Sequence, residues 1–217
     1  MQRVQLKQFG LGLASADRED DSAFAFETRY ICALYERHFV SPLGFELWKI
    51  DVECAPAVVR PGIRCALGIA MTQARFDYSA YLAASGVARA VMALDALHEG
   101  CLGVARSQGW SEAPFDDAYR RVVADEYRNE ATSPPLLGPD KAHVAVVHSI
   151  HDADRYRAWL IVYGRHGEEI ARTQVIDELP DELIFARRLG RAKWKGPSRV
   201  VFVSSGDEVL GAIDINR

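Results

Sequence analysis

The sequence lacks the long apolar runs and the secretion signal that would place a chain in or across a membrane. No run of eighteen or more apolar residues occurs among its 217 residues, which argues against a transmembrane helix. The N-terminal stretch MQRVQLKQFGLGLASADREDD has no continuous apolar core, so it does not read as a secretory signal. We therefore expect a cytoplasmic protein with no membrane partner.

Cysteine is scarce, and its spacing argues against two kinds of site. The chain has 4 cysteines, Cys32, Cys54, Cys65 and Cys101, and no two of them form a C-x-x-C pair. Structural zinc sites use closely spaced ligand pairs, and disulfide frameworks belong to oxidising compartments. We expect reduced, mostly buried thiols.

Three common catalytic or nucleotide-binding motifs are also missing. The sequence contains no G-x-x-x-x-G-K-[ST] loop, no G-x-G-x-x-G after a strand and no G-x-S-x-G elbow. These absences argue against a nucleotide-binding loop and an α/β-hydrolase nucleophile. We predict no cofactor and no metal.

What the chain does have is ample material for a core and a slightly acidic balance. Hydrophobic residues make up 49% of the sequence, and the formal net charge is −4. A general nucleic-acid binder is more often basic, so the balance disfavours that class.

The first third of the chain alternates apolar and polar residues and predicts strands. Runs over 3–13, 26–40, 44–55 and 63–76 are separated by short turns such as SPLG and RPG, which favour antiparallel neighbours. In KIDVECA, alternation puts Lys49, Asp51 and Glu53 on one face, which we interpret as solvent-facing.

The period then changes from two to between three and four. Residues 77–109 carry apolar side chains at helical spacing and end at Gly109, and 112–130 form a second amphipathic helix. Strands return after residue 141, including hairpins around RHG and GD, and PDELIFARRLGRAKWKG reads as a short helix with a basic tail.

These elements predict an α+β fold of antiparallel sheets with a central pair of amphipathic helices. Residues 1–131 form a meander plus the helix pair, 132–140 a proline-rich linker or crossover, and 141–217 a strand-rich part that belongs to the same domain or to a second one.

A cluster of histidines in HVAVVHSIHDADRYRAWLIVYGRHG suggests a metal or catalytic site. His148, His151 and Asp152 have a ligand-like spacing. On a strand, however, residues three apart point to opposite faces, so the cluster does not converge by itself. We interpret these residues as strand ends and turns, and keep a metal-dependent or catalytic site as the alternative.

A second candidate for chemistry lies on the predicted helix at LDALHEG. His98 has Asp95 three residues before it and Glu99 directly after it, and a carboxylate at this spacing can orient a general base. The second histidine of H-E-x-x-H is absent, so a structural ion pair is the favoured interpretation.

Charged clusters offer two binding surfaces of opposite sign. An acidic surface could attract a basic partner, and a basic tract with an interleaved tryptophan could pair with and stack on RNA. The acidic candidates are Asp17, Glu19, Asp20, Asp21, Glu112, Asp116 and Asp117, and the basic tract comprises Arg187, Arg188, Arg191, Lys193, Trp194, Lys195 and Arg199.

The whole chain resembles, by general character, the cytosolic immunity proteins of bacterial polymorphic-toxin and contact-dependent inhibition systems. The resemblance rests on the motif-free sheet segment FELWKIDVECA, the helix pair that begins at YLAASGVARAV, and the acidic balance. It implies a non-enzymatic protein that neutralises a cognate, basic toxin by covering its active site. The alternatives are a hydrolase using histidine and carboxylate, and an RNA-associated module using residues 187–199.

Overall fold

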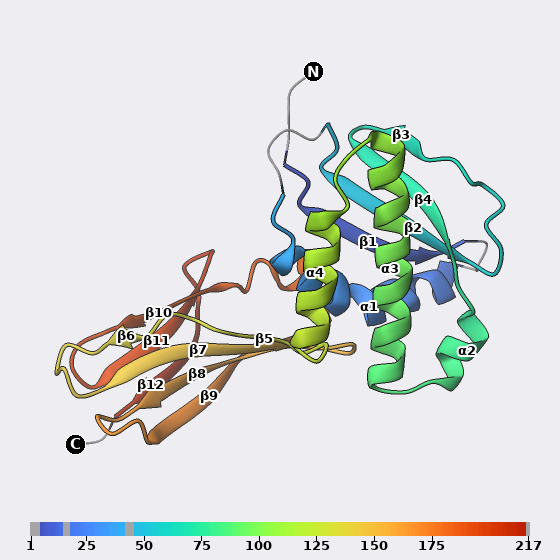
Figure 1. Cartoon of the computed structure of the whole chain (residues 1–217). Helices are drawn as coiled ribbons and strands as arrows, with labels where there is room; N and C mark the ends of the chain where they lie inside the picture. The colour runs from blue at the N-terminus through green and yellow to red at the C-terminus, as the bar shows by residue number, and fades with distance from the viewer. Residues whose placement is uncertain (1–4, 15–17, 42–45, 216–217) are drawn as a thin grey trace. The chain divides into compact units, whose positions relative to one another are not determined.

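The computed structural model describes residues 5–14, 18–41 and 46–215 and divides the chain into two compact units. The first unit is Met1–Asn129 and the second is Glu130–Arg217. The boundary lies at the edge of the proline-rich segment that the sequence marks as a linker. The predicted α+β class is confirmed, because helices and antiparallel sheets are both present (Figure 1).

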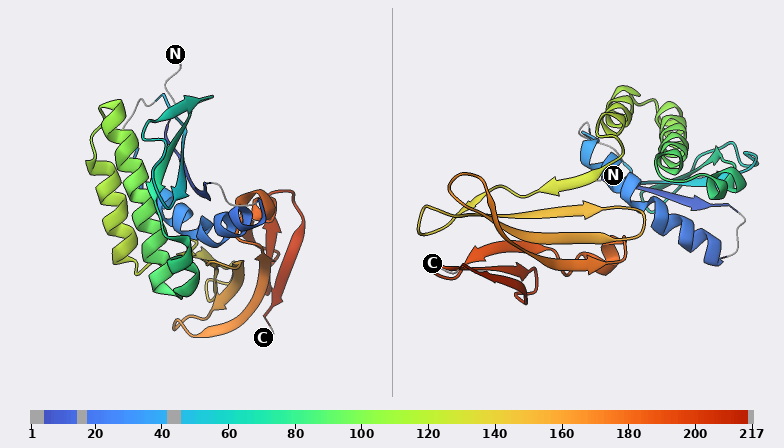
Figure 2. Two further views of the ribbon diagram at one scale, coloured as in Figure 1. Left: turned by 90° about the vertical axis from the view of Figure 1, so that its right-hand side faces the viewer. Right: turned by 90° about the horizontal axis from the view of Figure 1, so that it is seen from below.

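The first unit is a four-stranded sheet covered on one face by helices. The strand order is β1-β2-β4-β3, with β1, β2 and β4 parallel and β3 antiparallel to β4. Figures 1 and 2 show α3 and α4 side by side, with α3 packed on the strands and α4 packed on α1 and α3. The elements are β1 (Gln8–Leu13), α1 (Arg18–His38), β2 (Lys49–Ala55), β3 (Arg64–Ala66), β4 (Ile69–Arg75), α2 (Tyr78–Ala83), α3 (Val87–Gln108) and α4 (Ala113–Ala124).

The predicted antiparallel meander is therefore wrong, and one misread segment explains the error. Residues 26–40, expected as a strand, form most of α1, which buries Phe24, Thr28, Ile31 and Tyr35 at steps of four, three and four. The period-two pattern of neighbouring apolar residues was coincidental. Because a helix lies between β1 and β2, the chain returns to the end of the sheet at which β1 begins, and β2 runs parallel to β1.

The two faces of the sheet differ as the alternation in β2 predicts. Ile50, Val52 and Cys54 are buried in the first core, whereas Lys49, Asp51 and Glu53 are half-exposed on the opposite face. Three of the four thiols, Cys32, Cys54 and Cys101, are buried in this unit, and Cys65 on β3 is exposed.

The side chains of α1 seal the free edge of β1. The backbone N–H of Phe9 donates to Glu36 Oε1 over 2.9 Å, the Phe9 carbonyl accepts from Arg29 over 3.2 Å, and the Leu13 N–H donates to Asp21 over 2.7 Å. Unpaired strand edges invite pairing with other chains, and these contacts remove that opportunity here.

The helix expected over 77–109 is interrupted near its start. α2 ends at Ala83, Gly86 has a φ of +51°, and α3 then runs to Gln108. Gly109 ends α3 in the left-handed region with a φ of +67°, as predicted for a glycine at this position.

The second unit consists of two antiparallel sheets that enclose a separate core. Its larger sheet has the order β5-β7-β8-β9 with β6 also paired to β7, and its smaller sheet has the order β10-β11-β12. Figure 2 shows the two sheets facing each other. The elements are β5 (Asn129–Thr132), β6 (Leu136–Leu137), β7 (Val144–His151), β8 (Tyr156–Tyr163), β9 (Glu169–Glu178), α5 (Glu182–Phe185), β10 (Gly190–Trp194), β11 (Arg199–Ser204) and β12 (Val209–Asp214).

Both hairpins predicted for the second unit are confirmed, as β8–β9 and β11–β12. The short helix is also present as α5, but its basic tail is the edge strand β10. Of the helices in the described ranges, none is long and apolar enough to cross a membrane.

Candidate binding cleft at the carboxyl end of the first sheet

The first unit has a cleft of about 640 Å³ where its parallel strands end. Leu13 ends β1, Ala55 ends β2 and Arg75 ends β4, and all three line the cleft. Because β1, β2 and β4 are parallel, their carboxyl ends meet at one edge of the sheet. Ligands of open α/β sheets characteristically bind at this edge.

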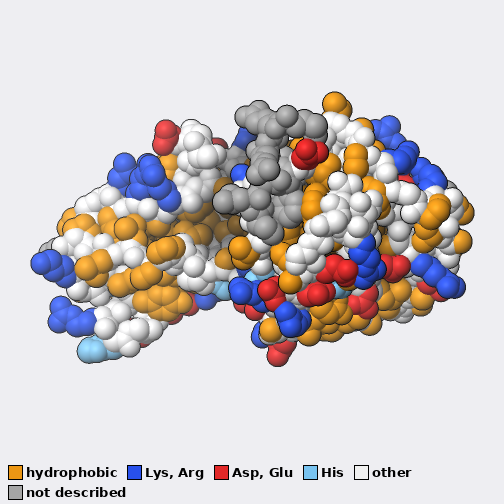
Figure 3. All heavy atoms as spheres, turned by 45° about the horizontal axis from the view of Figure 1, so that its top comes forward, with side chains coloured by type: hydrophobic (Ala, Val, Ile, Leu, Met, Phe, Trp, Pro, Cys, Tyr) orange, Lys and Arg blue, Asp and Glu red, His pale blue; other side chains and the backbone are white. Residues whose placement is uncertain are grey.

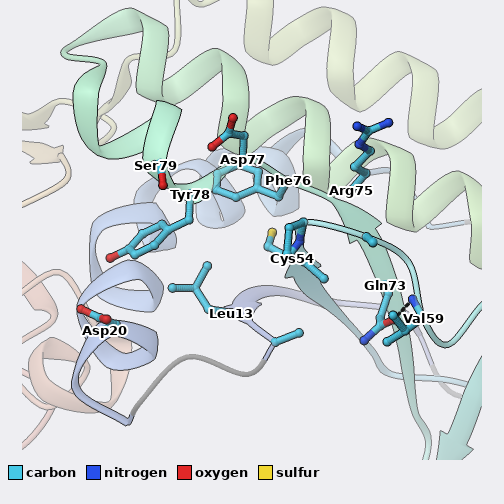
Figure 4. Close-up of a pocket in the computed structure, with 14 residues that line it drawn as sticks. Leu13, Asp20, Cys54, Val59, Gln73, Arg75, Phe76, Asp77, Tyr78 and Ser79 are labelled. Atoms are coloured by element: carbon cyan, nitrogen blue, oxygen red, sulfur yellow. Dashed lines mark hydrogen bonds between the residues drawn. The ribbon is translucent and has the colours of Figure 1, made fainter.

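Apolar side chains form most of the cleft floor. Cys54, Ala55 and Phe76 are buried beneath it. Figure 4 shows Leu13 and Tyr78 pointing into the open space, with Asp20 beside them on α1. A partner side chain entering here would meet hydrocarbon first and a carboxylate at the side.

A glutamine fixes the loop that forms another wall. Gln73 Oε1 accepts the backbone N–H groups of Val59 and Arg60 over 3.1 and 2.9 Å, and Gln73 Nε2 donates to Glu53 over 3.3 Å. Val59 is 73% exposed and lines the cleft. The structure thus holds an apolar side chain in solvent at the rim.

The acidic first turn of α1 lies at this cleft. Glu19 and Asp20 are exposed, and Asp20 is among the lining residues. Asp21 is half-buried, because it caps the end of β1. Asp17, the remaining member of this predicted acidic group, lies outside the described residues.

The second acidic group contacts neighbours from α3 and α4. Glu112 accepts two hydrogen bonds from Arg106, over 3.0 and 2.8 Å, which lowers the pKa of its carboxyl group. Asp116 lies 3.2 Å from His98, and Asp117 pairs with Arg120. Each of these three acids therefore has a basic or imidazole neighbour from α3 or α4.

The chemistry of the cleft does not favour a thiol nucleophile. Burial raises the pKa of Cys54 far above its ordinary value, with smaller contributions from Cys32 and Glu99. Nucleophilic cysteines need the thiolate form. Cys54 is therefore part of the floor and stays protonated.

His98 joins two helices and leaves little of its ring free. Its Nε2 faces Asp116 of α4, its Nδ1 lies 3.4 Å from the Tyr35 hydroxyl, and its ring packs on Tyr119 with 4.5 Å between centroids. Asp95 accepts from the Tyr119 hydroxyl over 2.8 Å, and Glu99 is exposed. The predicted pairing of His98 with carboxylates on its own helix is thus replaced by a network of contacts between α3 and its neighbouring helices α1 and α4.

The histidines of the second unit have separate structural roles. His151 is buried, its Nε2 donates to the Pro180 carbonyl over 2.9 Å, and its ring packs edge-on against Phe185. His148 lies 3.1 Å from the Thr132 hydroxyl and stacks on Trp159. Within the described ranges, no group of three or more His, Cys, Asp or Glu residues could hold a metal ion.

Asp152 belongs to the turn after β7, as its spacing predicted. It accepts the Arg155 backbone N–H over 3.0 Å and pairs with Arg157. The pKa of Asp152 is lowered, because its hydrogen bonds outweigh burial, whereas the nearby Asp152 carboxylate raises the pKa of Asp154.

The basic tract is only partly free. Arg188 pairs with Glu178, Lys193 with Asp207 and Arg199 with Asp214. Trp194 packs against the second core and donates its indole N–H to the Leu136 carbonyl over 3.1 Å. Among the described residues no ion-pair partner is found for Arg187, Arg191 or Lys195.

Most of the cleft was not predicted from the sequence. Leu13, Val59, Gln73 and Tyr78 carry no motif, and they converge because β1, β2 and β4 are parallel. The one available signal was the helical spacing between Phe24 and Tyr35.

No family model, curated protein or solved structure matches the chain.

Proposed function

We propose that the chain is a protein-binding inhibitor of the immunity type. Its first unit would dock a basic, partly apolar segment of a cognate toxin and thereby cover the toxin's active site. The observation that carries the proposal is the exposed Asp20 on the wall of an apolar-floored cleft.

The cleft suits the two parts of a long basic side chain. Lysine and arginine lay their hydrocarbon stems on apolar surface while the charged head stays at a polar edge. Leu13 and Tyr78 offer surface for the stem, and Asp20 offers a carboxylate for the head. The net charge of −4 would add longer-range attraction to a basic partner.

The features of the histidines and thiols favour binding over catalysis. His98 and His151 are held in structural contacts, and Cys54 is protonated in the cleft floor. We assign the protein to the bacterial cytoplasm, where an exposed thiol such as that of Cys65 stays reduced.

The test is affinity capture of the tagged chain from its native cells at low and moderate salt, with mass spectrometry of the bound protein. Asp20→Lys should weaken the captured complex by about tenfold or more, because it places like charge against the basic segment. Asp117→Lys is the matched control, since it makes the same charge change on α4 and should alter binding about threefold or less.

Two further outcomes separate the parts of the proposal. If Asp20→Lys and Asp117→Lys weaken binding equally, general charge and not the cleft holds the partner. If the captured protein keeps its full enzymatic activity when saturated with this chain, the inhibitor role is wrong.

A further inference from the structure

The second unit has its own cleft, beside the free edge of β10. The cleft measures about 610 Å³, and its apolar lining includes Val147, Tyr156, Ile176, Leu189 and Phe202. Arg191 is the one charged group among the described residues that line it. Figure 3 shows a band of hydrophobic side chains across this part of the molecule, with Lys and Arg near its ends.

The register of β10 shows which of its backbone groups are unpaired. Leu189 accepts from the Ser205 N–H over 2.7 Å, and Lys195 donates to the Arg199 carbonyl over 2.8 Å. In an antiparallel ladder every second residue points its N–H and C=O groups to the neighbouring strand. Arg191 and Lys193 therefore face β11, and the intervening residues Gly190, Ala192 and Trp194 face away.

No other strand pairs with this side of β10 within the described part of the chain. Trp194 reaches over to the Leu136 carbonyl of β6 through its side chain, over 3.1 Å. Because β6 and β10 belong to different sheets, this bond links the two sheets at the Trp194 end of β10. Gly190, Arg191 and Ala192 line the cleft, so one of its walls includes this part of the open strand edge.

Other polar groups on the wall already have partners. The Ser133 hydroxyl donates to the Pro134 carbonyl and accepts the Val147 N–H, and Thr132 lies 3.1 Å from His148. The groups left to bind a ligand are the edge of β10 and the Arg191 guanidinium.

We propose that this edge binds an extended segment of another protein, in which apolar residues alternate with acidic ones. The segment would add a strand beside Gly190 and Ala192, so that its N–H and C=O groups pair with theirs. Strand addition draws affinity from the main chain and specificity from pockets for alternate side chains.

Apolar side chains of the segment would enter the 610 Å³ cleft. The acidic side chains would lie on the opposite face, where Arg191 lines a smaller hollow of about 400 Å³ together with Lys193 and its partner Asp207. Opposite charges on adjacent strands stabilise pairing. An acyl chain would fill the apolar cleft as well, but it would leave the backbone groups of β10 unpaired.

The probe is a fluorescent eight-residue peptide that alternates valine and glutamate, measured by anisotropy with the full chain. It should bind, and the same peptide with lysine in place of glutamate should not. Arg191→Glu should weaken binding about tenfold, and Arg165→Glu, the same charge change in the β8–β9 turn, about threefold or less.

Backbone pairing is tested on both partners. Ala192→Pro removes an outward N–H without touching the ladder to β11 and should abolish binding. With the unaltered chain, peptides N-methylated at all valines or at all glutamates should differ, because only one set of amides faces β10.

Hydrogen exchange decides between strand addition and simple filling of the cleft. On peptide binding, the amides of Gly190 and Ala192 should become protected. Displacement of the peptide by laurate leaves the proposal standing only if laurate fails to protect those amides. Peptide binding that leaves these two amides exchanging freely, or equal binding of both methylated peptides, overturns the proposal.

Discussion

Arg29 and Glu36 form an ion pair of 2.7 Å on α1, directly against the free edge of β1. Their side chains are 14% and 17% exposed, and each also bonds a backbone group of Phe9. One ion pair thus attaches α1 to β1 and occupies backbone groups on the outer edge of the sheet.

Removing one partner of this pair should destabilise the first unit strongly. Glu36→Ala leaves the Arg29 guanidinium half-desolvated and the Phe9 N–H without its acceptor, which we expect to cost about 2–4 kcal/mol. Urea unfolding measures it. Glu169→Ala breaks the more exposed pair with Arg172 and should cost less than about 1 kcal/mol; equal losses would contradict this account.

Two glycines of α3 should respond in opposite directions to alanine. A Cβ on Gly100 would lie 2.5 and 2.7 Å from the methyl carbons of Val52, whereas one on Gly103 would meet only Thr72 Oγ1 at 4.0 Å. Overpacking costs about 1–3 kcal/mol, and alanine favours a helix over glycine by about 1 kcal/mol.

We therefore expect Gly100→Ala to lower the melting temperature and Gly103→Ala to raise it. The second substitution serves as the control for helix propensity in the same element. Calorimetry of both variants is the measurement, and a rise for Gly100→Ala would mean that β2 yields more readily than its packing indicates.

His98 should titrate below its ordinary value, because burial disfavours its charged form, while Asp116 partly offsets that effect. Between the lowered folded pKa and the unfolded value of 6.5, the unfolded chain binds the proton and the folded chain does not. His98 thus contributes stability above pH 6.5, and this contribution is lost as the pH falls through the folded pKa.

Asp116→Asn should lower the pKa of His98 further, because it removes the carboxylate that favours imidazolium. An NMR titration of the ring measures the shift. Asp117→Asn is the matched control on the same helix, since Asp117 pairs with Arg120. A pKa of His98 that stays the same or rises in Asp116→Asn would show that the two groups do not interact.

His151 and His148 should differ in their effect on the second unit. His151→Ala removes the donor to Pro180 and a ring packed on Phe185 and Tyr156, so we expect a loss of about 2–3 kcal/mol. His148→Ala removes an exposed hydrogen bond to Thr132 and should cost about 0.5 kcal/mol. A shared metal site would instead make both variants lose metal-dependent stabilisation, which chelator treatment of the unaltered chain would reveal.

The sequence predicted those elements whose pattern has a single interpretation. The hairpins β8–β9 and β11–β12 combine β-branched runs with tight turns, and Gly109 ends α3 where expected. In both cases local chemistry and tertiary packing favour the same structure.

Prediction failed where two periods overlapped. In α1, Tyr30, Cys32 and Leu34 mimic a strand, and burial of Ile31 and Tyr35 together with Phe24 is visible only once the helix is built. The cleft could not be found without that helix, because its lining depends on parallel strands. The open edge of β10 was not predicted either. Only the pairing of β10 with β11 shows that the backbone groups of Arg191 face β11, whereas those of Ala192 face away.

The placement of the thiols allows unfolding of the first unit to be followed by thiol modification. Cys65 is accessible in the folded chain, whereas Cys32, Cys54 and Cys101 lie in the core formed by α1, β2 and α3. An alkylating reagent would therefore modify one site per molecule while the unit is closed, and the remaining three together once it unfolds. The time between these two events measures how slowly the first unit unfolds, with no label, tag or added chromophore in the protein.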